Sequence, residues 1–116
     1  MKIAVVGSRE GFTYEDVSIK LDGIINVCED SIISGGARGV DTYAEKYSKQ
    51  NLIPMKIIKP IDPSKKLDYI FRNIEIICEA DKIIAFHDGL SRGTKFVIYY
   101  AKARNKKVII FDKPQS

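Results

Sequence analysis

Short apolar runs alternate with helix-like patterns along the whole chain of 116 residues. The apolar runs cover residues 2–6, 31–34, 55–58, 82–86 and 108–111. Most are continuous rather than alternating, which is typical of parallel strands buried on both faces. Between them, apolar residues recur every three or four positions, which indicates helices. Strands alternating with helices in this way predict an α/β fold: a three-layer sandwich around a five-stranded parallel sheet.

The simplest winding of such a chain gives the strand order 3-2-1-4-5, which reverses between the first and fourth strands. Ligands of open α/β sheets bind at this reversal, beside the carboxyl ends of the strands. The loops expected there are Gly7-Ser8-Arg9 and residues 88–94, with residues 34–41 next to them. We therefore expect these three loops to form one site.

Each helix is expected to bury one apolar stripe. The first begins at a Thr13 cap with Asp16 in the capping-box position, and its stripe is Val17, Leu21, Ile24, Ile25 and Cys28. The second covers residues 40–50, with an inner stripe of Val40, Ala44 and Tyr47.

The last two helices are predicted in the same way. The third is capped by Asp62 or Ser64, and its stripe is Leu67, Ile70, Phe71, Ile74, Ile77 and Cys78. The fourth covers residues 94–104, with Thr94 as a candidate cap and Phe96, Val97, Tyr100 and Ala101 facing inward. Residues 112–116 are expected to be a short tail.

Composition indicates a single globular domain over residues 1–116, with 45% hydrophobic and 29% charged residues. No apolar run approaches the roughly 20 residues that span a bilayer, and a strand begins at once, without a signal peptide. Cys28 and Cys78 fall among aliphatic residues and are expected to be buried free thiols, which fits a cytoplasmic location. One histidine and two cysteines exclude a zinc site of familiar spacing, so no metal is expected.

A glycine-rich turn joins the second strand to the second helix. Its sequence is Ser34-Gly35-Gly36-Ala37-Arg38-Gly39-Val40-Asp41. Glycines let a ligand approach the backbone, and the following helix offers free N–H groups to an anion. Arg38 adds a two-pronged donor for phosphate, and Asp41 could reach sugar hydroxyls. The alternative is that the glycines only close a tight turn and Asp41 only complements the helix dipole.

The arginines are distributed differently from the lysines. Arg9, Arg38 and Arg92 each follow a predicted strand in a Gly- or Ser-containing loop, whereas the lysines are dispersed. The net charge of +4 permits nucleic-acid binding, but no dense basic run with interleaved aromatic residues is present. Arg72-Asn73 interrupts the third helix and either reaches the site or lies on a solvated face.

Binding residues outnumber catalytic candidates in these loops. The dinucleotide G-x-G-x-x-G and Walker motifs are absent, and a single histidine cannot supply a Ser-His-Asp arrangement. His87 is more readily interpreted as a hydrogen-bonded structural residue than as a base. Asp41 and Asp88 remain the candidates for carboxylate chemistry.

The three loops and Arg72-Asn73 together resemble the signature of the SLOG superfamily, and in particular its YspA-like single-domain proteins. The resemblance covers nearly the whole chain and implies a Rossmann-like domain that binds nucleotides or nucleotide-derived molecules. The same glycine-rich pieces resemble the core of the DNA-processing A proteins, which bind single-stranded DNA. The related LOG phosphoribohydrolases carry P-G-G-x-G-T-x-x-E, whose glutamate takes part in N-glycosidic cleavage. Here Gly93-Thr94 are kept but Val97 replaces that glutamate, which argues against this activity.

The sequence therefore predicts a domain that binds or senses a nucleotide derivative such as ADP-ribose or NAD, with no required cofactor. The predicted ligand-binding residues are Gly7, Ser8, Arg9, Ser34, Gly35, Gly36, Ala37, Arg38, Gly39, Asp41, Arg72, Asn73, Asp88, Gly89, Ser91, Arg92, Gly93 and Thr94. The first alternative is an enzyme that cleaves a nucleotide N-glycosidic bond, using Asp41 or Asp88. The second is a module that binds single-stranded nucleic acid. A homodimer with contacts at Tyr99 and Tyr100 is also considered.

Overall fold

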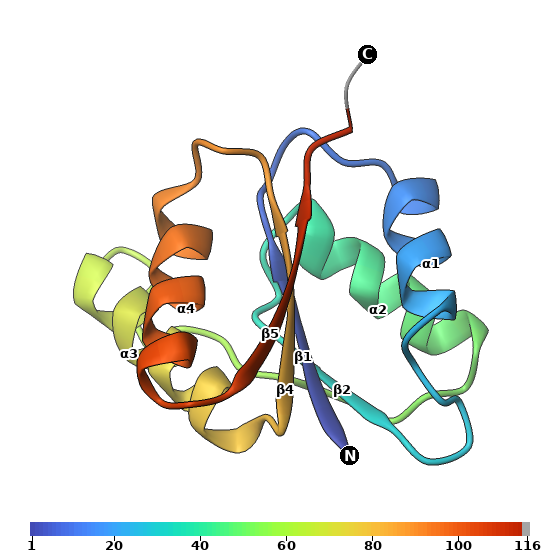
Figure 1. Cartoon of the computed structure of the whole chain (residues 1–116). Coiled ribbons are helices and arrows are strands. Elements are labelled where there is room, and N and C mark those ends of the chain that lie inside the picture. Colours follow the sequence, from blue (N-terminus) through green and yellow to red (C-terminus); the bar gives the residue numbers. More distant parts are fainter. Residues whose placement is uncertain (115–116) are drawn as a thin grey trace.

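The computed structural model describes residues 1–114, in which a five-stranded parallel sheet lies between two layers of helices (Figure 1). The elements are β1 (Lys2–Gly7), α1 (Tyr14–Asp22), β2 (Ser31–Ser34), α2 (Val40–Gln50), β3 (Met55–Ile57), α3 (Lys66–Glu79), β4 (Lys82–His87), α4 (Arg92–Ala103) and β5 (Lys107–Asp112). The strand order β3-β2-β1-β4-β5 confirms the predicted α/β fold and its topology. Helices α1 and α2 cover one face of the sheet, and α3 and α4 cover the other.

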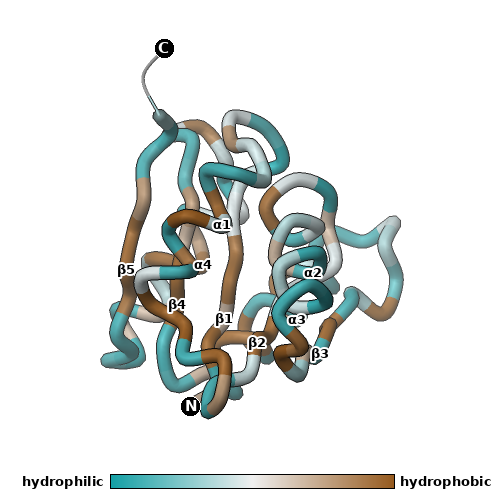
Figure 2. The backbone as a smooth tube through the Cα atoms, turned by 90° about the vertical axis from the view of Figure 1, so that its right-hand side faces the viewer, coloured by the Kyte–Doolittle hydropathy of each residue, from teal (hydrophilic) through white to brown (hydrophobic). Residues whose placement is uncertain are grey.

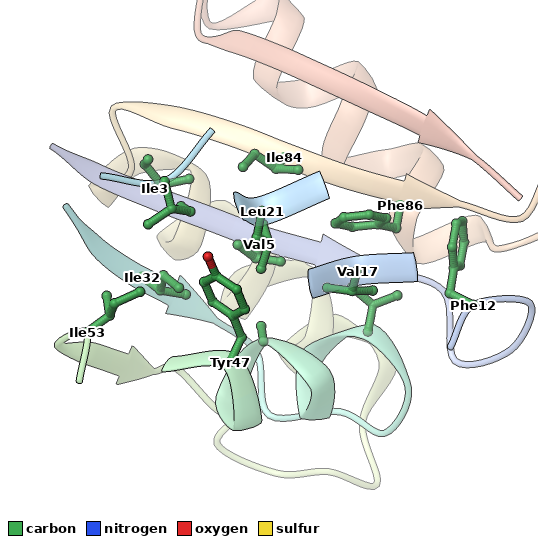
Figure 3. Packing of buried hydrophobic residues seen from close by; sticks show 13 residues of the cluster. Ile3, Val5, Phe12, Val17, Leu21, Ile32, Tyr47, Ile53, Ile84 and Phe86 are labelled. Carbon is green, nitrogen blue, oxygen red and sulfur yellow. The ribbon is translucent and has the colours of Figure 1, made fainter. Parts of the chain in front are cut away.

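Two hydrophobic clusters lie on the two faces of the central strands β1 and β4. On one face Val5, Ile84 and Phe86 pack under α1 and α2, as Figure 3 shows. On the other face Ala4 and Ala85 pack against α3 and α4. Figure 2 shows the strands as hydrophobic stretches joined by more hydrophilic segments. Because helices cover both faces of the sheet, the sequences of its strands are continuous apolar runs.

Helix α1 begins as predicted but ends earlier. Thr13 and Asp16 form the capping box: the Asp16 N–H donates to Thr13 Oγ1 at 3.1 Å, and the Thr13 N–H donates to Asp16 Oδ2 at 2.8 Å. The helix stops at Asp22, so the expected continuation of its stripe through Cys28 is wrong. In the segment after the helix, Asn26 takes part in local hydrogen bonds between side chains and backbone N–H groups. Such bonds compete with helix formation.

The two cysteines are free thiols as predicted, but both are exposed. Their predicted burial is therefore wrong. Cys28 lies in the turn after α1, and Cys78 lies on the outer side of α3. Helix α2, in contrast, has its predicted bounds and buries its predicted stripe of Val40, Ala44 and Tyr47.

Helix α3 departs most from the prediction. It begins after Lys65, which makes no side-chain cap hydrogen bond, whereas Asp62 and Ser64 bond to each other in the preceding turn. Its fully buried residues are Ile76 and Ile77. Most of the predicted stripe is instead exposed, namely Leu67, Ile70, Phe71 and Cys78.

Helix α4 starts two residues earlier than predicted. Its cap is Ser91, whose hydroxyl accepts from the Thr94 N–H at 3.3 Å, so Thr94 is not the cap. Val97 and Ala101 are buried as expected, while Phe96 and Tyr100 are half-buried and stack on each other. Strand β5 extends into the expected tail, of which residues 115–116 lie outside the described range. Within residues 1–114, no helix combines the length and apolarity that crossing a membrane requires.

Candidate functional site

A cleft of about 510 Å³ opens beside the carboxyl ends of the strands, around the point where the strand order reverses. The buried apolar side chains that line it form its floor, namely Val6, Ile76 and Val97. Loops after β1, β2 and β4, together with one side of α3, form its polar walls. The cleft contains most of the predicted ligand-binding residues, namely Gly7, Arg9, Gly35, Ala37, Arg38, Asp41, Arg72, Asn73, Asp88, Ser91, Gly93 and Thr94.

The remaining predicted residues lie behind or beside the cleft. They are Ser8, Ser34, Gly36, Gly39, Gly89 and Arg92. The Ser8 hydroxyl is buried, donates to the Phe86 carbonyl at 3.4 Å and accepts from the Asp88 N–H at 3.0 Å. The Ser34 hydroxyl donates to the Val5 carbonyl at 2.8 Å. Both hydroxyls therefore connect neighbouring strands and loops instead of facing a ligand.

Gly39 allows the loops after β1 and β2 to touch. Its φ of +80° is left-handed, and a Cβ there would lie 2.6 Å from the Arg9 carbonyl oxygen and 2.7 Å from that of Ser8. Any side chain would push the two loops apart. This glycine therefore shapes the cleft wall without lining it.

Arg72 connects α3 to the glycine-rich loop. Its Nη1 donates to the Gly35 carbonyl at 2.6 Å, and its Nε donates to Asn73 Oδ1 at 2.8 Å. A Cβ on Gly35 would lie 2.8 Å from Arg72 Cζ and 3.0 Å from Asp41 Oδ2. The missing side chain of Gly35 therefore leaves the space that the Arg72 guanidinium and the Asp41 carboxylate occupy.

Asp41 is the buried charge of the site. It is only 6% exposed, at the start of α2, and its Oδ2 accepts from the Ala37 N–H at 3.1 Å. Burial raises the pKa of this carboxyl to about 6, although the Ala37 N–H and the nearby Arg72 lower it. At neutral pH the ionised Asp41 therefore occupies part of the turn that the sequence suggests for an external anion.

The loop after β4 is held by its own side chains. Asp88 Oδ1 accepts from the N–H groups of Leu90 and Ser91, each at 2.8 Å, and these bonds lower the pKa of Asp88. His87 Nε2 lies 3.2 Å from the Ser91 carbonyl oxygen, which favours its structural interpretation. In residues 1–114, the N–H groups of Arg92 and Gly93 form no hydrogen bond. These two donors at the start of α4 are available to an anion.

The charges around the cleft differ in how they are paired. Arg38 Nη2 lies 3.3 Å from Glu10 Oε1 in an exposed ion pair. Asp41 and Asp88 accept hydrogen bonds from their own loops. Arg9 forms no salt bridge with any residue in the range 1–114. All three carboxylates of the cleft thus have protein partners, whereas some of the positive groups do not.

Several lining residues were not predicted, including Glu10, Tyr69 and Leu90. The Tyr69 ring centroid lies 5.4 Å from Arg72 Cζ, so a planar cation and an aromatic ring line the cleft together. Tyr69 could have been predicted, since it precedes Arg72 by about one helical turn. Across residues 1–114, no three His, Cys, Asp or Glu side chains gather closely enough to hold a metal ion.

No protein-family model and no curated protein matches this chain, but solved structures do. DNA processing protein A from Streptococcus pneumoniae matches with a TM-score of 0.83 and 22% identity, over 99% of this chain and 50% of that one. The Helicobacter pylori protein, described for its single-stranded DNA binding mode, matches with a TM-score of 0.77 and 20% identity, over 100% and 66% of the two chains. The structural-genomics target TM1055 matches with a TM-score of 0.73 and 22% identity, over 92% and 71%.

These likenesses show a shared Rossmann-like fold. The expected similarity to the DNA-processing A core is thus supported at the level of the fold, and the narrower similarity to YspA-like proteins stays a prediction. The chain spans half the length of the first of these proteins and about two thirds of the second.

Proposed function

We propose that this domain binds a nucleotide or a nucleotide-derived molecule, such as ADP-ribose or NAD, in the cleft at the reversal of the strand order. One observation carries the proposal: every carboxylate of the cleft has a protein partner, while Arg9 forms no salt bridge and the N–H groups of Arg92 and Gly93 form no hydrogen bond within residues 1–114. Such a site favours an anion. Its volume of about 510 Å³ suits a small organic ligand.

The cleft suggests where each part of a nucleotide would bind. The phosphate would lie at the start of α4, within reach of Arg9 and Arg38. Asp41 lines the cleft, and its carboxylate would accept from a ribose hydroxyl. The ring of Tyr69 offers a surface on which a base could stack.

We favour binding over hydrolysis. Val97 stands on the apolar floor of the cleft, with Ile76 and Val6 beside it. These side chains cannot act as acid or base. Asp41 and Asp88 are the remaining candidates for N-glycosidic cleavage, and release of free base from a nucleoside monophosphate would reveal such an activity.

Single-stranded DNA is the second candidate ligand. One of the proteins with this fold is described as binding single-stranded DNA. The net charge of +4 is compatible with this function. Two of the donors named above, Arg9 and Gly93, line the same cleft, which favours a compact anion over a long strand.

Calorimetry with AMP, ADP-ribose, NAD and a short oligonucleotide tests the proposal, using wild type, Arg38→Ala and Arg104→Ala. We expect Arg38→Ala to weaken nucleotide binding at least tenfold with little change in melting temperature, because the exposed Arg38–Glu10 pair contributes little to stability. Arg104→Ala removes the same charge at the far end of α4 and should bind as wild type does. Absence of nucleotide binding, or unchanged binding by Arg38→Ala, would contradict the proposal.

A further inference from the structure

The outer side of α3 exposes apolar side chains that the monomer leaves uncovered. Leu67 is 62% exposed, Phe71 is 61% exposed and Ile70 is 38% exposed. The buried residues Ile76 and Ile77 lie on the neighbouring side of the same helix. The apolar arc of α3 is therefore wider than its contact with the sheet requires.

The neighbouring helix α4 extends this surface. Gly93 and Val97 line the cleft together with residues of α3, so this side of α4 faces α3. Phe96 and Tyr100 lie near that side and stack with ring centroids 5.7 Å apart. Tyr99 points outward and is 74% exposed. We call this surface the α3/α4 apolar face; its members are Leu67, Ile70, Phe71, Ile74, Phe96, Tyr99 and Tyr100.

The size of the face is appropriate for the centre of a protein interface. Large side chains of this kind carry roughly 200 Å² each, so the four most exposed members offer on the order of 450 Å². A standard interface buries about 800 Å² on each partner, including a polar rim. The α3/α4 apolar face would supply its apolar centre, and the charged edges of the two helices would supply the rim.

Those two edges carry opposite charges. Asp68 and Glu75 lie on the side of α3 away from α4, in a groove that Lys59 of the preceding loop also lines. Arg72 lines the same groove, but its guanidinium donates to the Gly35 carbonyl. On α4, Lys95 and Lys102 lie about half a turn from Gly93, hence away from α3. Neither Glu75 nor Lys95 forms a salt bridge within residues 1–114.

We propose that the α3/α4 apolar face binds the same face of a second copy of this chain. When a two-fold axis runs parallel to the helices, α3 lies on α4 of the second copy, and the acidic edge meets the basic edge twice. A two-fold axis across the helices would instead place acidic edge on acidic edge. Because Ile76 and Val97 both line the cleft, we place Glu75 and Lys95 at a similar level, where they would pair between the copies.

This arrangement is independent of whether the cleft binds a nucleotide. The α3/α4 apolar face is complementary to the same face of a second copy in both apolar surface and charge. We therefore propose a second copy of this chain, and not a different protein, as its partner. The two helices also form cleft walls through Tyr69 and Gly93. The dimer would therefore hold both walls of each cleft from outside.

Analytical ultracentrifugation at micromolar concentrations tests the interface. We expect wild type to sediment at twice the monomer mass of 13.1 kDa. Phe71→Glu and Tyr99→Glu should each weaken dimerisation at least tenfold. Leu52→Glu, which places the same charge at an apolar residue 89% exposed just after α2, should leave the dimer intact. Circular dichroism checks that each variant folds. If Phe71→Glu fails to fold, the effect of Tyr99→Glu on dimerisation is the test of the interface.

Charge reversal tests the orientation. Glu75→Lys and Lys95→Glu should each weaken the dimer, and the double variant should restore it. A monomeric wild type, or dimers unaffected by both Phe71→Glu and Tyr99→Glu, would overturn the proposed interface. If the double variant dimerises more weakly than either single variant, α3 does not lie on α4 of the second copy.

Discussion

Asp41 is a charged residue that the fold itself uses. Its carboxylate lies at the start of α2 and accepts a hydrogen bond from the Ala37 N–H. The carboxylate and the Arg72 guanidinium both lie next to Gly35. A negative charge at the beginning of a helix is favourable, but burial of that charge is costly. The pKa of about 6 indicates that the cost of burial exceeds these gains.

Asp41→Asn tests this balance. The folded protein holds a proton on Asp41 up to about pH 6, whereas in the unfolded chain the carboxyl ionises near its ordinary pKa of 3.8. The contribution of Asp41 to stability is therefore full below about pH 4 and is lost as the pH rises toward and through 6. Asn cannot ionise and keeps an acceptor for the Ala37 N–H, so we expect this variant to be more stable than wild type at pH 7 by about 1–3 kcal/mol.

Urea unfolding of both proteins at several pH values between 4 and 7 measures the effect, with the difference between them isolating Asp41. The two stabilities should converge toward pH 4. Parallel stability curves across this range would show that Asp41 has an ordinary pKa.

At the level of whole helices and strands, the sequence predicted the strands better than the helix faces. Buried parallel strands consist of continuous apolar residues, so β1 and β4 are unmistakable. Helix α3 was harder because its apolar arc is wide: Leu67 and Phe71 follow the helical period as well as Ile77 does, yet only Ile77 is buried. Periodicity identifies an apolar side of a helix but not whether its partner belongs to the same chain.

Helix α4 provides a second prediction. Gly93 lies in its first turn, and a Cβ there would meet no atom within 4 Å. Gly93→Ala should therefore stabilise the fold by about 0.5–1 kcal/mol, because alanine favours the helix. The added methyl group would stand where we place the phosphate, so nucleotide affinity should fall at the same time.

Thermal melting and calorimetry of Gly93→Ala measure these two effects separately. Lys102→Ala, in the last turn of the same helix, serves as the control and should leave nucleotide affinity unchanged. A Gly93→Ala variant with unchanged affinity would place the phosphate elsewhere in the cleft.

Considered as a whole, the molecule brings three loops together because its strand order reverses between β1 and β4. That convergence could be predicted from the sequence, and it places Arg9, Gly35 and Asp88 around one cleft. The sequence could not predict which polar groups the protein satisfies internally. Ser8 has the same chemistry as an exposed phosphate-binding serine, but its hydroxyl bonds to Phe86 and Asp88. Such pairings depend on distances that only the folded chain defines.

The charge of the whole molecule leads to the last prediction. With a net charge of +4 and dispersed lysines, the protein could attract any polyanion at low salt. A long single strand releases about 0.7 counterions for each phosphate contacted, so its affinity falls steeply with salt. A nucleotide gripped through one or two phosphates should show a much shallower slope. We therefore expect ADP-ribose affinity to fall only a few-fold between low and physiological salt, while any oligonucleotide affinity falls far more. A steep slope for a tightly bound oligonucleotide, together with no nucleotide binding, would identify the cleft as part of a DNA-binding surface.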